Sequence, residues 1–198
     1  MLRRAHIPLH MTEATVRVHF ESTPNPQSLK FVVDRPIASD SAEFKQGEPT
    51  FRSPLAKKLF GFPWTQGVFI GRDFVTVTKQ DWVDWETLAE PLSGLIAEHI
   101  ERGEAVLTET EPDLNATNTE DTPTVQTIKR ILNDEIRPAV AMDGGDVAFD
   151  RYEDNVVYLM MKGSCAGCPS STYTLKEGIA TRLRSAIPEI KDVVGIDA

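Results

Sequence analysis

An acidic, proline-containing segment divides this chain and limits the fold on either side of it. It runs from Thr108 to Thr124 and reads TETEPDLNATNTEDTPT, with five acidic residues, no Lys or Arg, and Leu114 as its single bulky apolar residue. Such a segment buries too little apolar surface to offset the entropy lost on ordering. We therefore expect two small α/β domains, residues 12–107 and 125–198, joined by an acidic flexible linker over residues 108–124.

The composition excludes several classes of protein. Of the 198 residues, 40% are apolar and 26% are charged, which is typical of globular domains. The formal net charge of −9 would repel a phosphate backbone, so we expect no nucleic-acid partner. No apolar run approaches the roughly 18–20 residues of a membrane span, so we expect no membrane association either.

The cellular compartment is predicted from the N-terminal segment and the cysteines. Met1–His10 contains two arginines, no serine and no apolar core, which is typical of neither a secretory signal nor a mitochondrial leader. The chain has only two cysteines, too few for a disulfide framework. These features favour the cytoplasm, with the mitochondrial matrix as the alternative.

The first half of the chain has the pattern of a mixed α/β domain. Period-two alternation predicts strands at Val16–Phe20, Leu29–Val33, Val68–Ile70 and Phe74–Thr78. Residues 34–50 are polar and irregular, so no element is expected there. Ser53 followed by Pro54 marks the start of a short helix, and a longer amphipathic helix is expected from Asp84 to Arg102, kinked or divided by Pro91. All three tryptophans are interpreted as core or near-core residues: Trp64, Trp82 and Trp85.

The second half predicts a small α-β-β-α-β domain with a three-stranded sheet and two helices, which gives the whole chain the α+β class. The expected elements are a helix from Val125 that Pro138 disturbs, strands at Val147–Tyr152 and Val156–Met161, a helix at Thr172–Ala186 and a strand within Ile187–Ile196. Gly144 and Gly145 end the first helix. We interpret the turn from Asp143 to Asp146 as a helix-terminating turn rather than a metal or acid–base pair.

The chemistry of the chain is concentrated in one loop, Gly163–Ser171. It holds both cysteines, Cys165 and Cys168, separated by two residues that allow both sulfurs to face one metal centre. The loop precedes a predicted helix, whose N-terminal partial charge favours thiolate, the form that binds metal and attacks disulfides. The pattern therefore predicts metal ligands or redox nucleophiles, without deciding between them.

The number of ligands narrows this choice. Structural zinc sites and iron–sulfur clusters generally use four protein ligands, and this chain has two cysteines in total. The simplest completion is a two-fold pair of loops that together supply four thiolates. A dithiol–disulfide oxidoreductase and a zinc-bridged interaction module remain as alternatives. Four thiolates accept either a [4Fe–4S] or a [2Fe–2S] cluster.

The loop and its surroundings resemble a known family. The stretch Met142–Asp146 (MDGGD), followed by Gly163–Ser171 (GSCAGCPSS), is similar to the C-terminal domain of NifU and the Nfu proteins. The first half resembles the Nfu N-terminal domain at Glu21–Pro26, Leu29–Phe31 and Asp73–Val77.

This resemblance implies an iron–sulfur cluster carrier rather than an enzyme. Cys165 and Cys168 would be the cluster ligands, shared across a homodimer that holds a labile [4Fe–4S] cluster. The family receives its cluster from an upstream scaffold and transfers it to apo-proteins. Its N-terminal domain is thought to engage clients or partners.

Overall fold

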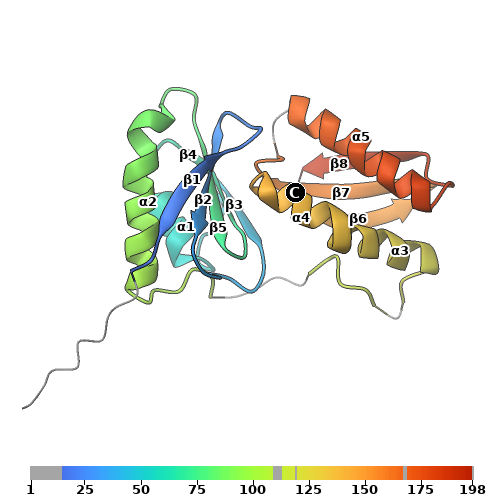
Figure 1. Cartoon of the computed structure of the whole chain (residues 1–198), viewed down its shortest axis with the longest axis horizontal. Helices are drawn as coiled ribbons and strands as arrows, with labels where there is room; N and C mark the ends of the chain where they lie inside the picture. The colour runs from blue at the N-terminus through green and yellow to red at the C-terminus, as the bar shows by residue number, and fades with distance from the viewer. Residues whose placement is uncertain (1–14, 109–112, 119, 167–168, 198) are drawn as a thin grey trace, which may run out of the picture.

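The structure is a computed structural model that describes residues 15–108, 113–118, 120–166 and 169–197, without the side chains of residues 169–174 and 197. Two sheets, each with its own hydrophobic core, lie side by side (Figure 1). The α+β class expected from the sequence is confirmed. Within the described residues, no helix combines the length and the apolar character needed to cross a membrane.

The N-terminal domain is a five-stranded antiparallel sheet in the order β1-β2-β5-β4-β3. Its elements are β1 (Val18–Ser22), β2 (Ser28–Val33), β3 (Ala42–Lys45), α1 (Pro54–Leu59), β4 (Thr65–Ile70), β5 (Phe74–Lys79) and α2 (Trp85–Glu101). One face of the sheet packs its apolar residues against the two helices, as Phe31 and Val75 show by their complete burial. Ser53 caps α1 by accepting from the Ala56 amide, as its sequence predicts.

The structure corrects three details of the N-terminal prediction. Residues 34–50 contain a strand, β3, in which Ala42 and Phe44 are buried against β4. Pro91 does not divide α2, which is one helix. Trp82 is 67% exposed and is not a core residue, whereas Trp64 is buried.

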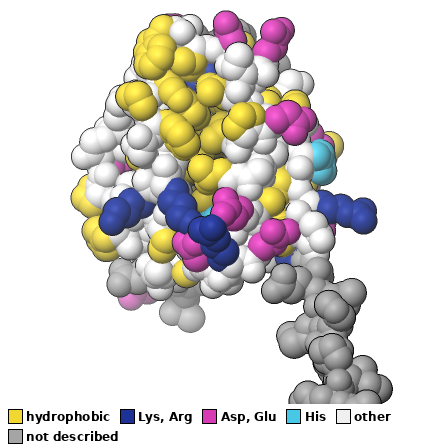
Figure 2. Space-filling view, turned by 90° about the vertical axis from the view of Figure 1, so that its left-hand side faces the viewer, with side chains coloured by type: hydrophobic (Ala, Val, Ile, Leu, Met, Phe, Trp, Pro, Cys, Tyr) yellow, Lys and Arg dark blue, Asp and Glu magenta, His cyan; other side chains and the backbone are white. Residues whose placement is uncertain are grey.

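The α2 side of the domain, which faces the viewer in Figure 2, shows a broad group of hydrophobic side chains bordered by charged ones.

The C-terminal domain has the expected order of elements around a three-stranded sheet, β6-β7-β8. Its elements are α3 (Pro123–Ile131), a π-helical turn η1 (Leu132–Ile136), α4 (Arg137–Met142), β6 (Gly145–Glu153), β7 (Val156–Gly163), α5 (Pro169–Ala186) and β8 (Asp192–Asp197). The first expected helix is thus a helical stretch widened at η1. The Arg137 amide bonds to the Leu132 carbonyl there, just before Pro138, which has no amide hydrogen to donate.

The segment expected to be a flexible linker is partly packed against the C-terminal domain. Asn115 is fully buried, and its side chain donates to the Val147 carbonyl (2.9 Å) and accepts from the Phe149 amide (2.7 Å). These are backbone groups of the edge strand β6, so Asn115 covers an edge that would otherwise be open. Asn115 is therefore packed rather than exposed, because its polar side chain has backbone partners that a composition-based argument does not anticipate.

Candidate functional site

Cys165 follows β7 and packs closely against the glycine turn that connects α4 to β6. A Cβ atom on Gly145 would lie 2.6 Å from the Cys165 Sγ and 2.7 Å from the Lys162 carbonyl oxygen. Gly144 and Gly163 adopt φ angles of +82° and +68°, which other residues rarely accept. Gly144 therefore provides the backbone conformation of the turn, and Gly145 leaves the space into which Cys165 packs.

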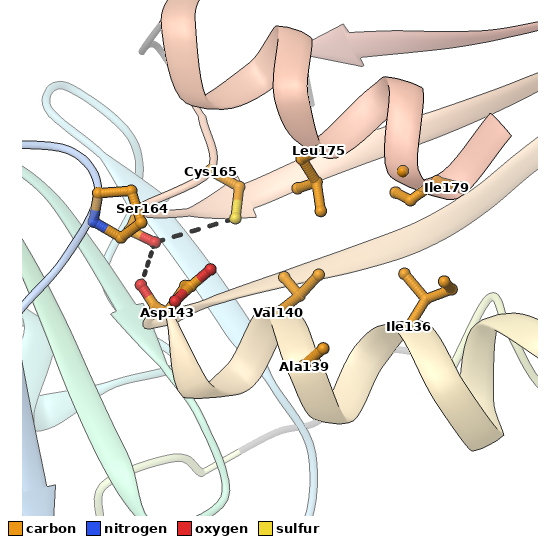
Figure 3. A pocket seen from close by; sticks show the side chains of 10 residues that line it. Ile136, Ala139, Val140, Asp143, Ser164, Cys165, Leu175 and Ile179 are labelled. Atoms are coloured by element: carbon orange, nitrogen blue, oxygen red, sulfur yellow. Dashed lines mark hydrogen bonds between the residues drawn. The ribbon is translucent and has the colours of Figure 1, made fainter. Parts of the chain in front are cut away.

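Ser164 joins the glycine turn to the cysteine loop (Figure 3). Its amide donates to the Gly144 carbonyl (3.2 Å), and its hydroxyl donates to the Asp143 carbonyl (2.5 Å). The same hydroxyl lies 3.9 Å from the Cys165 Sγ. Ser164 thus joins the glycine turn to the cysteine loop through both its backbone and its side chain, at the position next to Cys165.

A cavity of about 570 Å³ leads to Cys165 between α4 and α5 (Figure 3). The side chains that line it are mainly apolar and include Ile136, Val140, Leu175 and Ile179. Cys165 itself is only 6% exposed and belongs to the core of the C-terminal domain, but the cavity reaches it. The thiol is therefore buried and still accessible from one side.

Burial raises the pKa of the Cys165 thiol to about 11. The Ser164 hydroxyl opposes this shift, whereas the carboxylates of Asp143, Asp146 and Glu43 add to it. Burial thus acts against the thiolate that the helix N-terminus is expected to favour at Cys165. Cys168, the second predicted ligand, lies outside the described residues.

Asp146, the last residue of the turn expected to end the first helix, forms contacts well beyond that turn. Both of its carboxylate oxygens accept from the Arg137 guanidinium (2.9 and 3.0 Å), and one also accepts from the Ser41 hydroxyl (2.8 Å). Arg137 also pairs with Asp113 at 3.2 Å. Among the described residues, no group of three or more His, Cys, Asp or Glu is arranged to hold a metal ion.

Sequence reasoning missed three residues of the N-terminal domain that reach this site. Lys30, Glu43 and Thr76 form hydrogen bonds with backbone atoms of the last residue of α4, of Gly163 and of the glycine turn, respectively. Glu43 lies on the unpredicted strand β3, and its burial raises its pKa. No local signal marks these residues, because their partners lie 68 to 120 positions further along the chain.

Two family models match successive parts of the chain. The family model "Scaffold protein Nfu/NifU N terminal" matches residues 18–103, and the model "NifU-like domain" matches residues 128–194. A solution NMR structure of a NifU-like protein from Saccharomyces cerevisiae covers 56% of this chain and 100% of its own, with 25% identity and a TM-score of 0.45.

Two curated relatives match both domains. The human protein "NFU1 iron-sulfur cluster scaffold homolog, mitochondrial" is 40% identical over 178 residues, which cover 89% of this chain and 70% of the human one. The protein of the same name from Drosophila sechellia is 40% identical over 196 residues, or 96% and 69% of the two chains. With an Nfu N-terminal domain followed by a NifU-like domain, this chain belongs to the Nfu family of NifU-related proteins.

Proposed function

We propose that this chain is an iron–sulfur cluster carrier that binds its cargo through Cys165 and Cys168. The observation that carries this proposal is that the only two cysteines of the chain lie three positions apart in a NifU-like domain. The names of the curated relatives describe iron–sulfur cluster scaffolds, which supports the same assignment. The chain itself would bind and release the cluster and catalyse no reaction.

The cluster is shared by two copies of the chain. A [4Fe–4S] cluster generally takes four protein ligands, and each chain supplies two thiols. A two-fold homodimer joined at the cysteine loops supplies the missing pair. The cavity that reaches Cys165 supports this proposal, since the thiol is not sealed inside the core.

The partners and the compartment follow from the role of a carrier. An upstream scaffold supplies the cluster and apo-proteins receive it, so each contact must be transient. The curated relatives are mitochondrial by name, which favours the mitochondrial matrix over the cytoplasm that we expect from the sequence.

Anaerobic reconstitution with iron and sulfide tests the proposal. We expect about four iron and four sulfide ions per two chains, and loss of both in Cys165→Ala and in Cys168→Ala. Ser185→Ala is the matched control, because Ser185 is an exposed residue near the end of α5 and should leave the iron content unchanged. Full iron and sulfide content in either cysteine variant would contradict the proposal.

Two further measurements on the same protein separate the alternatives that use these thiols. A dithiol–disulfide oxidoreductase would catalyse the reduction of a protein disulfide in the absence of iron and sulfide. A zinc-bridged module would contain zinc and no sulfide after anaerobic purification. Acid-labile sulfide in the purified protein would exclude it.

A further inference from the structure

One row of residues crosses the N-terminal sheet on the face opposite its two helices. In the strand register, Lys30 of β2 lies opposite Thr76 of β5, Thr76 lies opposite Phe69 of β4, and Phe69 lies opposite Glu43 of β3. Directly paired residues point to the same face of a sheet. The four side chains therefore form a continuous line, which we call the transverse row, on the side where the C-terminal domain lies (Figure 1).

The first two residues of the transverse row bind the glycine turn and the end of the helix before it. The Thr76 hydroxyl donates to the Gly144 carbonyl (2.7 Å), and the Lys30 ammonium donates to the Met142 carbonyl (3.1 Å). Thr76 is 1% exposed and Lys30 is 8% exposed, so both bonds are largely shielded from water. A buried hydroxyl without a partner is costly, which makes these contacts more than incidental surface bonds.

The second half of the row binds the start of the cysteine loop. The Gly163 amide donates to the Glu43 carboxylate (2.8 Å). A Cβ atom on Gly163 would lie 3.0 Å from the ring of Phe69, which is 2% exposed and belongs to neither domain core. Phe69 is thus buried by the contact between the domains, and the absence of a side chain at Gly163 allows that contact.

The row acts on the backbone that sets the position of Cys165. The Gly144 carbonyl accepts from Thr76 and also from the amide of Ser164, the neighbour of Cys165. The chain of contacts therefore passes from the N-terminal sheet through one carbonyl oxygen to the cysteine loop. The Cys165 side chain itself points into the cavity between α4 and α5 (Figure 3).

We propose that Lys30, Thr76, Phe69 and Glu43 are positioning residues of the cluster site. Through them, the N-terminal domain fixes the position of the backbone around Cys165. This inference rests on the proposed carrier function and extends it, because the cluster site then includes residues of both domains. None of the four side chains needs to touch the cluster. Their role is to hold the glycine turn and the cysteine loop at the spacing that the Cys165 thiol requires.

Amide hydrogen exchange of the full-length apo-protein tests the contact without any cluster. Thr76→Val removes the hydroxyl donor at nearly constant shape, and we expect about tenfold faster exchange at Ser164 and Gly163. Thr76→Ser retains a hydroxyl and should restore the wild-type rates. Thr78→Val is the matched control, because Thr78 lies two positions along the same strand and bonds to Ser28 within its own domain.

Glu43 provides an independent arm of the same test. Glu43→Gln keeps an oxygen that can accept from the Gly163 amide, whereas Glu43→Ala removes it. We expect protection of Gly163 to survive the first change and to be lost in the second. Equal protection of Gly163 in Glu43→Ala and in the wild type, or of Ser164 in Thr76→Val and in the wild type, would overturn the proposal.

The loaded protein then tests positioning itself, with the rate of iron loss to a chelator as the measurement. We expect Thr76→Val to lose iron about tenfold faster than the wild type, while Thr76→Ser and Thr78→Val lose it at the wild-type rate. Faster exchange in the apo-protein with an unchanged rate of iron loss would show docking without positioning and would overturn the proposal. If the wild type takes up no cluster, the proposed function is wrong, and the row has no cluster site to position even where the exchange results show docking.

Discussion

Cys165 lines the α4–α5 cavity, next to Ser164 and in close contact with Gly145. Three carboxylates, of Asp143, Asp146 and Glu43, disfavour a negative charge on its sulfur, and burial disfavours that charge more strongly. At the scale of single residues, the apo-protein therefore keeps this thiol protonated. A protonated thiol at neutral pH reacts slowly with oxidants and alkylating reagents, which would protect Cys165 before it binds the proposed cluster.

The reactivity of Cys165 can be measured alone in the Cys168→Ala variant. Because thiolate is the reacting form and the pKa of the Cys165 thiol is raised to about 11, its alkylation rate should rise steadily from pH 7 to beyond pH 10. The urea-unfolded chain, with an ordinary thiol pKa of about 8.5, should level off near pH 9.5. Iodoacetamide labelling followed by mass spectrometry gives both profiles, and a folded profile that levels off near pH 9.5, as in the unfolded chain, would contradict the assignment.

Gly145 leaves no room for a side chain. Gly145→Ala places a methyl group 2.6 Å from the Cys165 Sγ and 2.7 Å from a backbone oxygen, so we expect a loss of about 1–3 kcal/mol in the free energy of unfolding. Gly178→Ala is the control, because nothing lies within 4 Å of its added methyl on α5 and the helix should gain up to about 1 kcal/mol. Urea unfolding followed by circular dichroism measures both, and equal stability of the two variants would contradict this packing.

Among the elements, those with strong local patterns were predicted and those set by distant partners were not. The β4–β5 hairpin, the β6–β7 hairpin and the cap of α1 follow from alternation and turn residues, and the structure confirms them. Strand β3 was missed because its four residues, Ala42–Lys45, alternate too briefly to be distinguished from a loop. The cysteine motif was visible in the sequence, but Glu43 and Thr76 were not, because a long-range backbone contact leaves no pattern near either residue.

The packed part of the acidic segment behaves as an additional element along the edge of β6. Asn115→Ala would leave the Val147 carbonyl and the Phe149 amide without their partner, and we expect a loss of about 2–4 kcal/mol. Asn118→Ala is the control at an exposed position of the same segment, with an expected loss below about 1 kcal/mol. Urea unfolding compares the two variants. A loss at Asn115 no larger than that at Asn118 would show that the segment does not support β6.

At the scale of the whole molecule, the N-terminal sheet lies between its own helices and the cysteine-bearing domain (Figure 1). Ser41 of the N-terminal domain, Asp113 of the acidic segment and Arg137 of α4 meet at Asp146 or its ion pair. Together with the transverse row, this polar network joins the two domains. In the structure the domains are therefore docked against each other through hydrogen bonds and ion pairs.

The central claim is that one chain supplies half of the ligands that its cluster requires. The most direct measurement is anaerobic native mass spectrometry of reconstituted wild-type chain mixed with a heavier, isotope-labelled copy that carries Cys165→Ala and Cys168→Ala. We predict a cluster of four iron and four sulfide ions only in pairs of two wild-type chains. A cluster in a wild-type monomer, or in a mixed pair with one wild-type chain, would contradict the claim.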